Sequence, residues 1–189
     1  MVRVIVVHRW YGNSACDWIP WLKAEMEKSG AEVVVPDMPN TNAPRIDQWV
    51  PFLKGVAGAV DGNTYFVGHS IGCQAVLRLL ETLPDGTRAG GAVLVAPWIN
   101  TLTNLSEGEP EIARPWLETP IKWGNIREHA GKIVDICSDD DPYVPSSEAE
   151  ILKRELSAKI VLDQKRGHFT DEDDVTQLPV LLKELKALI

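Results

Sequence analysis

A serine stands between two glycines at residues 68–72, where the sequence reads Gly-His-Ser-Ile-Gly. Strand-forming residues precede this stretch and a helical pattern follows it. A Gly-x-Ser-x-Gly pattern at such a strand-to-helix turn is typical of a nucleophile elbow, which exposes the serine hydroxyl at the carboxyl edge of a parallel sheet. A glycine-rich turn without a chemical role is the simpler alternative, but the position between strand and helix favours Ser70 as a nucleophile for acyl transfer.

A serine hydroxyl is a weak nucleophile, so it needs a general base and an acid that orients the base. After an elbow of this kind, the acid and the base follow in the order Asp, His, each beyond a later strand. His168, in the stretch 166–174, follows the last expected strand and is the best base among the four histidines. The acid lies within 138–145, which contains three adjacent carboxylates, Asp139, Asp140 and Asp141. Such a cluster could instead bind a hard cation or cap the next helix.

Two backbone N–H groups are expected to hold the oxyanion that forms during acyl transfer. The Ile71 N–H lies at the start of the helix after the elbow, where the positive end of the helix dipole also favours negative charge. The second donor should come from the loop after the first strand, residues 8–13, which lies beside the elbow if the strand order is 2-1-3-4-5-6. We predict the Trp10 N–H, with Arg9 or Tyr11 as alternatives.

The chain contains seven tryptophans, which suggests an aromatic-lined pocket. We predict four pocket residues around the nucleophile: Tyr11, His69, Trp98 and Phe169. Trp98 lies in the segment 97–122, which contains four prolines and is predicted to be a long loop, or flap, near the site. Packing of this loop against the body is an equally good explanation for Trp98 and a better one for Trp116 and Trp123.

Short apolar runs alternate with helical patterns along the whole chain. Strands are predicted at 3–8, 31–39, 64–68, 89–97, 131–138 and 158–163, and helices at 17–30, 45–60, 71–83, 146–156 and 174–188. Apolar strands that alternate with helices are typical of a parallel sheet with helices on both faces. We therefore expect a single domain over residues 1–189, with a three-layer, doubly wound α/β fold and a mostly parallel six-stranded sheet.

Composition argues against several other functions. The net charge is −8 and no basic stripe is present, so a nucleic-acid partner is not expected. The apolar run at 2–8 is too short to span a membrane or to act as a signal peptide. The three cysteines are odd in number and widely spaced, which predicts neither a disulfide framework nor a zinc site, and reduced thiols favour a cytoplasmic protein. No metal or cofactor is expected at the site.

Several motifs together carry a family resemblance. They are the stretches "GHSIG", "DDDPYVP" and "GHF", with "MP" after the second strand and "WVPFL" in the second helix. With them the chain resembles the α/β-hydrolases over nearly its whole length, and in particular the small capless serine hydrolases of the retinoblastoma-binding protein 9 and YdeN family. The resemblance implies a minimal fold without a full cap domain, Ser70 as nucleophile, His168 as base and Asp141, which opens Asp-Pro-x-x-Pro, as acid. The Leu-x-Cys-x-Glu motif behind the retinoblastoma-binding name is missing, so that partner is not expected.

These observations predict a serine hydrolase that cleaves a small ester, thioester or amide through an acyl-enzyme. The expected partner is a small-molecule acyl substrate. Two alternatives use the same fold. An acyltransferase would use the same three residues and pass the acyl group to an acceptor other than water, and a non-catalytic protein would bind a ligand in the pocket without turnover.

Overall fold

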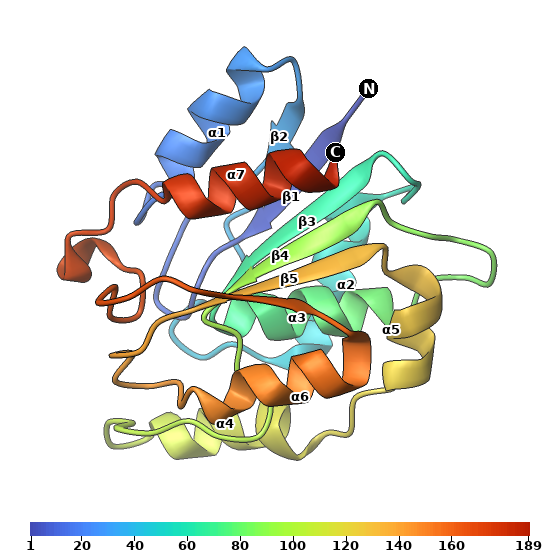
Figure 1. Ribbon diagram of the computed structural model, residues 1–189. Coiled ribbons are helices and arrows are strands. Elements are labelled where there is room, and N and C mark those ends of the chain that lie inside the picture. The colour runs from blue at the N-terminus through green and yellow to red at the C-terminus, as the bar shows by residue number, and fades with distance from the viewer.

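The computed structural model describes all of residues 1–189 and contains a six-stranded sheet (Figure 1). The strands are β1 (Arg3–Val7), β2 (Glu32–Val34), β3 (Thr64–His69), β4 (Gly91–Val95), β5 (Lys132–Cys137) and β6 (Lys159–Leu162). They lie in the order β2-β1-β3-β4-β5-β6, and every neighbouring pair is parallel, which confirms the predicted topology. Because β1 and β3 are neighbours, the loop after β1 lies beside the turn that contains Ser70.

Seven α-helices cover the two faces of the sheet (Figure 1). One face carries α1 (Ile19–Lys28) and α7 (Pro179–Leu188). The other face carries α2 (Ile46–Ala57), α3 (Ile71–Leu80), α4 (Glu109–Glu118), α5 (Trp123–His129) and α6 (Ser147–Leu156). None of these helices has the length and apolar character that crossing a membrane requires. The three-layer arrangement is the one that the alternation of strands and helices predicts.

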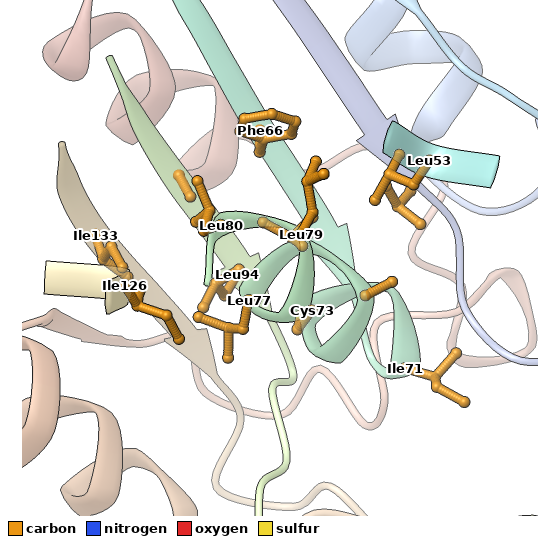
Figure 2. Packing of buried hydrophobic residues seen from close by; sticks show 14 of the residues in the cluster. Leu53, Phe66, Ile71, Cys73, Leu77, Leu79, Leu80, Leu94, Ile126 and Ile133 are labelled. Carbon is orange, nitrogen blue, oxygen red and sulfur yellow. The ribbon is translucent and has the colours of Figure 1, made fainter. Parts of the chain in front are cut away.

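Two hydrophobic clusters fill the spaces between the sheet and its helices. The larger contains 29 buried residues on the α2–α6 side, and the smaller contains 19 on the side of α1 and α7. Neighbouring residues of the central strands alternate between them, so that Leu94 belongs to the larger cluster and Val93 to the smaller. Figure 2 shows leucines of α3 lying over Phe66 and Leu94. Every residue of α3 is buried, so the helix that follows Ser70 is fixed along its whole length.

The segment 97–122 differs from the predicted loop, because it contains α4. Pro110 lies in the first turn of this helix, where a missing N–H costs nothing, and only Pro115 lies inside it. Trp116 is fully buried, so packing outweighs the cost of the interior proline. The buried Arg78 guanidinium donates hydrogen bonds to two carbonyl oxygens at the end of the helix, at 2.8 and 2.9 Å. These bonds satisfy backbone groups that have no partner within a helix.

Smaller differences concern the ends of other elements. Residues 123–129 form α5, which is not among the predicted helices, and His129 at its end is buried, with Nδ1 2.8 Å from the Thr87 carbonyl oxygen. The last helix begins at Pro179 instead of 174, and a 3-10 helix over Asp171–Asp173 precedes it. A capping box begins this short helix, and Asp174 directly after it has a left-handed φ of 60°, so the chain leaves the helical conformation where the longer helix was expected to begin.

One buried side chain of the sheet has no polar partner. Asp135 in β5 is fully buried, and neither of its carboxylate oxygens has a hydrogen-bond partner. Burial raises the pKa of Asp135 to about 7. The pKa of the Cys73 thiol is also raised, by burial and then by the charge of Asp135, so this cysteine is kept protonated. The carboxyl group therefore makes the stability of the fold depend on pH.

We predict that Asp135→Asn removes a loss of stability that the wild type suffers as the pH rises from about 4 to about 7. In that range the native carboxyl keeps its proton while the carboxyl of the unfolded chain has lost it, so the free energy of unfolding falls. Relative to the wild type, the variant should gain on the order of 2–4 kcal/mol between pH 4 and pH 8. Urea unfolding at both pH values measures the difference, with the exposed Asp85→Asn as control. If the free energies of unfolding of the variant and the wild type differ by the same amount at both pH values, the prediction is wrong.

Candidate active site

Ser70 lies in the turn between β3 and α3, with φ 54° and ψ −117°. A positive φ at a residue other than glycine costs about 1–3 kcal/mol and persists only where the surrounding structure enforces it. The strained turn places the hydroxyl at the carboxyl end of the sheet and directly before the first residue of the helix. The side chain is nearly buried, with 5% of its residue surface exposed, so only a small opening reaches it.

The two flanking glycines are required by close backbone contacts. A Cβ atom at Gly68 would lie 2.7 Å from the Cα of Cys73 in the first turn of α3. A Cβ atom at Gly72 would overlap with the carbonyl oxygen of Val7 at the end of β1. Glycine therefore lets α3 begin directly against β1 and β3. The spacing Gly-x-Ser-x-Gly is thus explained by packing around the serine.

A short hydrogen bond joins His168 and Asp141. The His168 Nδ1 lies 2.8 Å from Asp141 Oδ2, and both side chains are largely buried. The other carboxylate oxygen of Asp141 accepts the backbone N–H groups of Tyr143 and Val144 at 2.8 and 3.0 Å. With Nδ1 as the donor to the carboxylate, the imidazole leaves Nε2 as an acceptor. The carboxylate thus holds the ring in the tautomer that a general base requires.

The two neighbouring aspartates bind the backbone of the loop that leads to His168. Asp139 Oδ1 accepts the N–H of Lys165, and Asp140 Oδ1 accepts the N–H of Gly167, both at 2.8 Å. The three adjacent carboxylates therefore have separate partners, and no three acidic, histidine or cysteine side chains converge to a metal-binding arrangement. Each aspartate contributes to the position of His168, two through the backbone and one through the ring.

Ser70 and His168 line the same cavity, which has a volume of about 400 Å³. Its wall contains aromatic and aliphatic side chains together with polar and charged ones, and besides Ser70 and His168 these residues are Arg9, Trp10, Tyr11, Trp98, Leu102, Leu105, Glu109, Pro142, Tyr143, Thr170, Glu172 and Asp173. No hydrogen bond joins Ser70 Oγ to His168 in this structure. Instead, Ser70 Oγ accepts the indole N–H of Trp98 at 3.3 Å. The cavity therefore holds both groups of a possible nucleophile–base pair, without a hydrogen bond between them.

The structure places two of the four predicted pocket residues in this cavity and two outside it. Tyr11 and Trp98 line the cavity, whereas His69 and Phe169 do not. His69, at the end of β3, is fully buried, with its ring 5.5 Å from that of Trp18 in the smaller hydrophobic cluster and 5.5 Å from that of His168. Phe169 is fully buried in the smaller hydrophobic cluster. The alternation of side chains along a strand turns His69 away from Ser70, which corrects its assignment to the pocket.

Eight wall residues are not among the predicted ones: the apolar or aromatic Leu102, Leu105, Pro142 and Tyr143, and the polar Glu109, Thr170, Glu172 and Asp173. Tyr143 contacts the His168 ring edge-on, with the ring centroids 5.2 Å apart. It lies two residues after Asp141 in "DPYVP", so its proximity to the acid was a signal available in the sequence. The leucines belong to an irregular segment before α4, whose path depends on tertiary contacts and has no local signature.

Two backbone N–H groups near the serine are free to donate. Ile71 is the first residue of α3, where the N–H has no acceptor within the helix. The Trp10 N–H donates no hydrogen bond either, while its indole N–H donates to the Asn42 carbonyl at 3.3 Å. The Tyr11 N–H is engaged by the Thr41 carbonyl at 3.1 Å. Of the three N–H groups in this loop that are candidates for the second oxyanion donor, that of Tyr11 is therefore not free.

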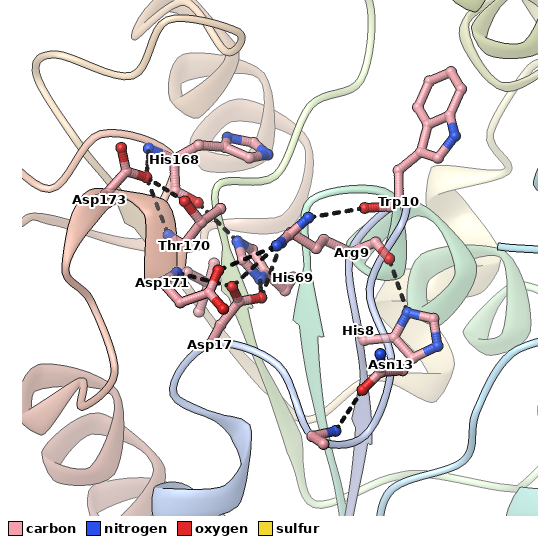
Figure 3. A network of polar contacts seen from close by, with 12 residues as sticks. His8, Arg9, Trp10, Asn13, Asp17, His69, His168, Thr170, Asp171 and Asp173 are labelled. Carbon is pink, nitrogen blue, oxygen red and sulfur yellow. Dashed lines mark hydrogen bonds and ion pairs between the residues drawn. The ribbon is translucent and has the colours of Figure 1, made fainter. Parts of the chain in front are cut away.

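A largely buried charge network connects the loops beside the cavity, whose wall includes Arg9 (Figure 3). Asp17 accepts Nε and Nη2 of Arg9 at 2.9 and 3.2 Å and the backbone N–H of Asp171 at 3.0 Å. His69 Nδ1 lies 3.6 Å from the Asp17 carboxylate, and its Nε2 is 2.8 Å from the carbonyl oxygen of His168. The network thus joins the loop after β1, the turn after β3 and the loop that carries His168.

The environment of this network favours an ionised Asp17 and a neutral His69. Burial alone would raise the pKa of Asp17, but the Arg9 guanidinium, which donates two hydrogen bonds to the carboxylate, lowers it well below its usual range. Burial lowers the pKa of His69, against the opposing effect of Asp17. A neutral imidazole can donate from Nε2 to the His168 carbonyl without carrying a buried charge. The charged part of the network is therefore Arg9 with the carboxylates of Asp17 and, at 3.5 Å, of Asp171.

We predict that Asp17→Asn lowers the free energy of unfolding at pH 7 by about 2–4 kcal/mol, because it leaves Arg9 without its largely buried counter-charge. A depressed native pKa contributes stability above the unfolded value, near pH 4, and this contribution is lost as the pH falls through that value toward the native pKa. The difference between wild type and variant should therefore shrink below pH 4. Urea unfolding at pH 7 and pH 3 measures it.

The matched control is Asp47→Asn, which breaks a two-bond Arg–Asp pair that is largely exposed. This variant should change stability by less than about 1 kcal/mol. Two outcomes would show that the buried pair contributes no more to stability than an exposed pair. One is an equal loss of unfolding free energy in the two variants, and the other is a loss for Asp17→Asn that is the same at pH 7 and pH 3.

Comparison with known proteins places this fold and site in one class. The serine hydrolase family matches residues 4–187. YdeN of Bacillus subtilis, which bears a hydrolase name, is 31% identical over 179 residues, which cover 95% of this chain and 92% of YdeN. The serine hydrolase RBBP9 of Rattus norvegicus is 26% identical over 187 residues, which cover 98% of this chain and 89% of RBBP9. The crystal structure of the ydeN gene product has a TM-score of 0.91 and 29% identity, and covers 100% of this chain and 98% of that chain.

The parallel sheet and the serine turn define a minimal α/β-hydrolase fold. The chain belongs to the serine hydrolase family within that superfamily, and it is an enzyme of the serine hydrolase class. The resemblance predicted from the motifs "GHSIG", "DDDPYVP" and "GHF" is thereby confirmed.

Proposed function

We propose that this enzyme cleaves a small ester, thioester or amide through an acyl-enzyme, with Ser70 as nucleophile, His168 as general base and Asp141 as the acid that orients the base. The observation that carries the proposal is the 2.8 Å hydrogen bond between His168 Nδ1 and Asp141 at the wall of the cavity that Ser70 also lines. Hydrogen bonds between a nucleophile and its base are often long or unformed without substrate. The missing bond between Ser70 and His168 is therefore compatible with this assignment.

In the proposed acylation, Ser70 Oγ attacks the substrate carbonyl carbon while its proton passes to His168 Nε2. The carbonyl oxygen becomes an oxyanion, which the N–H groups of Ile71 and Trp10 stabilise because neither has another acceptor. Asp141 stabilises the imidazolium that forms. The tetrahedral intermediate collapses when the leaving group takes the proton from His168. Water then attacks the acyl-enzyme with His168 again as base, and Ser70 recovers its proton.

The cavity favours a small acyl substrate with apolar character. A volume of about 400 Å³ lies near the lower end of ligand pockets, and aromatic and leucine side chains form much of its wall. Trp98, Leu102, Leu105 and Glu109 all come from the segment 97–122, which supports its proposed role as a flap beside the site. Trp116, in contrast, packs in the larger hydrophobic cluster away from the cavity. A cytoplasmic location is also part of the proposal, based on three free cysteines.

The proposal predicts that a fluorophosphonate probe labels the wild type at Ser70 and that Ser70→Ala abolishes labelling. Ser70→Ala and His168→Ala should lower kcat on p-nitrophenyl acetate by at least about three orders of magnitude. Asp141→Asn should have a smaller but still large effect, because the histidine ring loses its orienting carboxylate. Labelling is read by intact-protein mass spectrometry and turnover by release of p-nitrophenol.

The control is Ser29→Ala, which changes an exposed serine at the end of α1 and should keep full labelling and turnover. Full labelling of Ser70→Ala, or an unlabelled wild type, would refute the assignment of the nucleophile.

A further inference from the structure

Trp98 makes a contact that packing alone does not require. Its indole N–H donates to Ser70 Oγ at 3.3 Å, and 1% of its residue surface is exposed. Three other tryptophans donate their indole N–H, and each donates to a backbone carbonyl oxygen, of Pro39, Asn42 or Pro44. Trp98 is thus the tryptophan whose indole bonds to another side chain, and that side chain is the proposed nucleophile.

Two buried polar side chains fix the position of Trp98. Gln74 in α3 donates from its amide to the Trp98 carbonyl oxygen at 3.0 Å. Glu148 in α6 accepts the backbone N–H groups of Ile99 and Asn100 at 2.6 and 2.8 Å. Gln74 and Glu148 are 0% and 2% exposed, and a buried carboxylate is costly unless its hydrogen bonds are satisfied. Side chains from α3 and α6 therefore hold the segment just after β4 in place beside Ser70.

We propose that Trp98 is a further catalytic residue, whose indole N–H holds and stabilises the reacting oxygen of Ser70. This inference rests on the proposed role of Ser70 as nucleophile. A hydroxyl has one donor hydrogen and two acceptor lone pairs. The indole occupies one lone pair, so the hydroxyl hydrogen remains available for Nε2 of His168. The donor acts on Oγ itself and is distinct from the backbone N–H groups of Ile71 and Trp10, which face the substrate oxygen.

The indole keeps its proton throughout the reaction. During acylation the O–H bond of Ser70 breaks, its proton passes to His168, and the bond between Oγ and the acyl carbon forms. During deacylation that bond breaks, the electron pair returns to Oγ, and His168 returns the proton. In both half-reactions negative charge on Oγ is stabilised by the Trp98 N–H, in a buried site where a fixed donor is more effective than in water.

The test compares Trp98→Phe with Trp116→Phe, since each variant loses one indole N–H from a nearly fully buried tryptophan. Trp98→Phe should lower the second-order rate of fluorophosphonate labelling and kcat for p-nitrophenyl acetate by about tenfold, the value of one hydrogen bond. Trp116→Phe should leave both rates, expressed per folded molecule, within about twofold of the wild type. Circular dichroism gives the folded fraction of each variant.

Because Trp98→Phe also changes packing, a second variant carries the isosteric analogue 3-benzothienylalanine at residue 98. This analogue replaces the N–H by sulfur and keeps the shape of the ring. An equal loss in both residue-98 variants supports the donor role of the indole. Wild-type rates in the analogue variant would overturn this inference and leave the proposed function intact. A wild type that the probe does not label would overturn the proposed function and this inference together.

Discussion

The close approach of α3 to β1 at Gly72 is the constraint on which the site depends. Because a Cβ atom there would overlap with the Val7 carbonyl oxygen, the helix can begin only where glycine stands. The chain must then reverse at Ser70 with a positive φ. Complete burial of α3 supplies the packing energy that maintains this strain. Relaxing Ser70 would move the helix start away from β1, and with it the serine hydroxyl and the free N–H of Ile71.

Carboxylates that bind backbone N–H groups arrange the other loops around the serine. Asp139 and Asp140 hold the loop before His168, and Asp141 binds both its own turn and the imidazole. Asp17 connects the loop after β1 to Asp171. For Asp17 and Asp141, whose side chains are largely buried, the hydrogen bonds that fix the loops also compensate the cost of burying their charge. Asp135, by contrast, has no partner and keeps its proton up to a pH of about 7, so its carboxyl lowers the stability of the fold as the pH rises from about 4 to neutral.

Much of the fold follows from the sequence, because each strand is a short apolar run and each helix repeats its apolar residues. The turn at Ser70 was also predictable, since it directly follows a strand, and so were the loops of Asp141 and His168, which follow later strands. The choice of Asp141 among three adjacent aspartates came from the family resemblance. The helix α4 was not, because burial of Trp116 and the hydrogen bonds of Arg78 are tertiary effects that override its prolines. The pocket was predicted only in part, since closeness in sequence to Ser70 and His168 does not tell which face of the sheet a side chain reaches.

The most direct test of this account is a crystal structure of the enzyme after reaction with a p-nitrophenyl phosphonate. The account predicts phosphorus bonded to Ser70 Oγ, with φ of that residue still positive and a phosphonyl oxygen within hydrogen-bond distance of the Ile71 and Trp10 N–H groups. It also predicts His168 Nε2 directed at Oγ, with Nδ1 still bonded to Asp141. An adduct on another residue, or an imidazole turned away from Ser70 in the adduct, would contradict it.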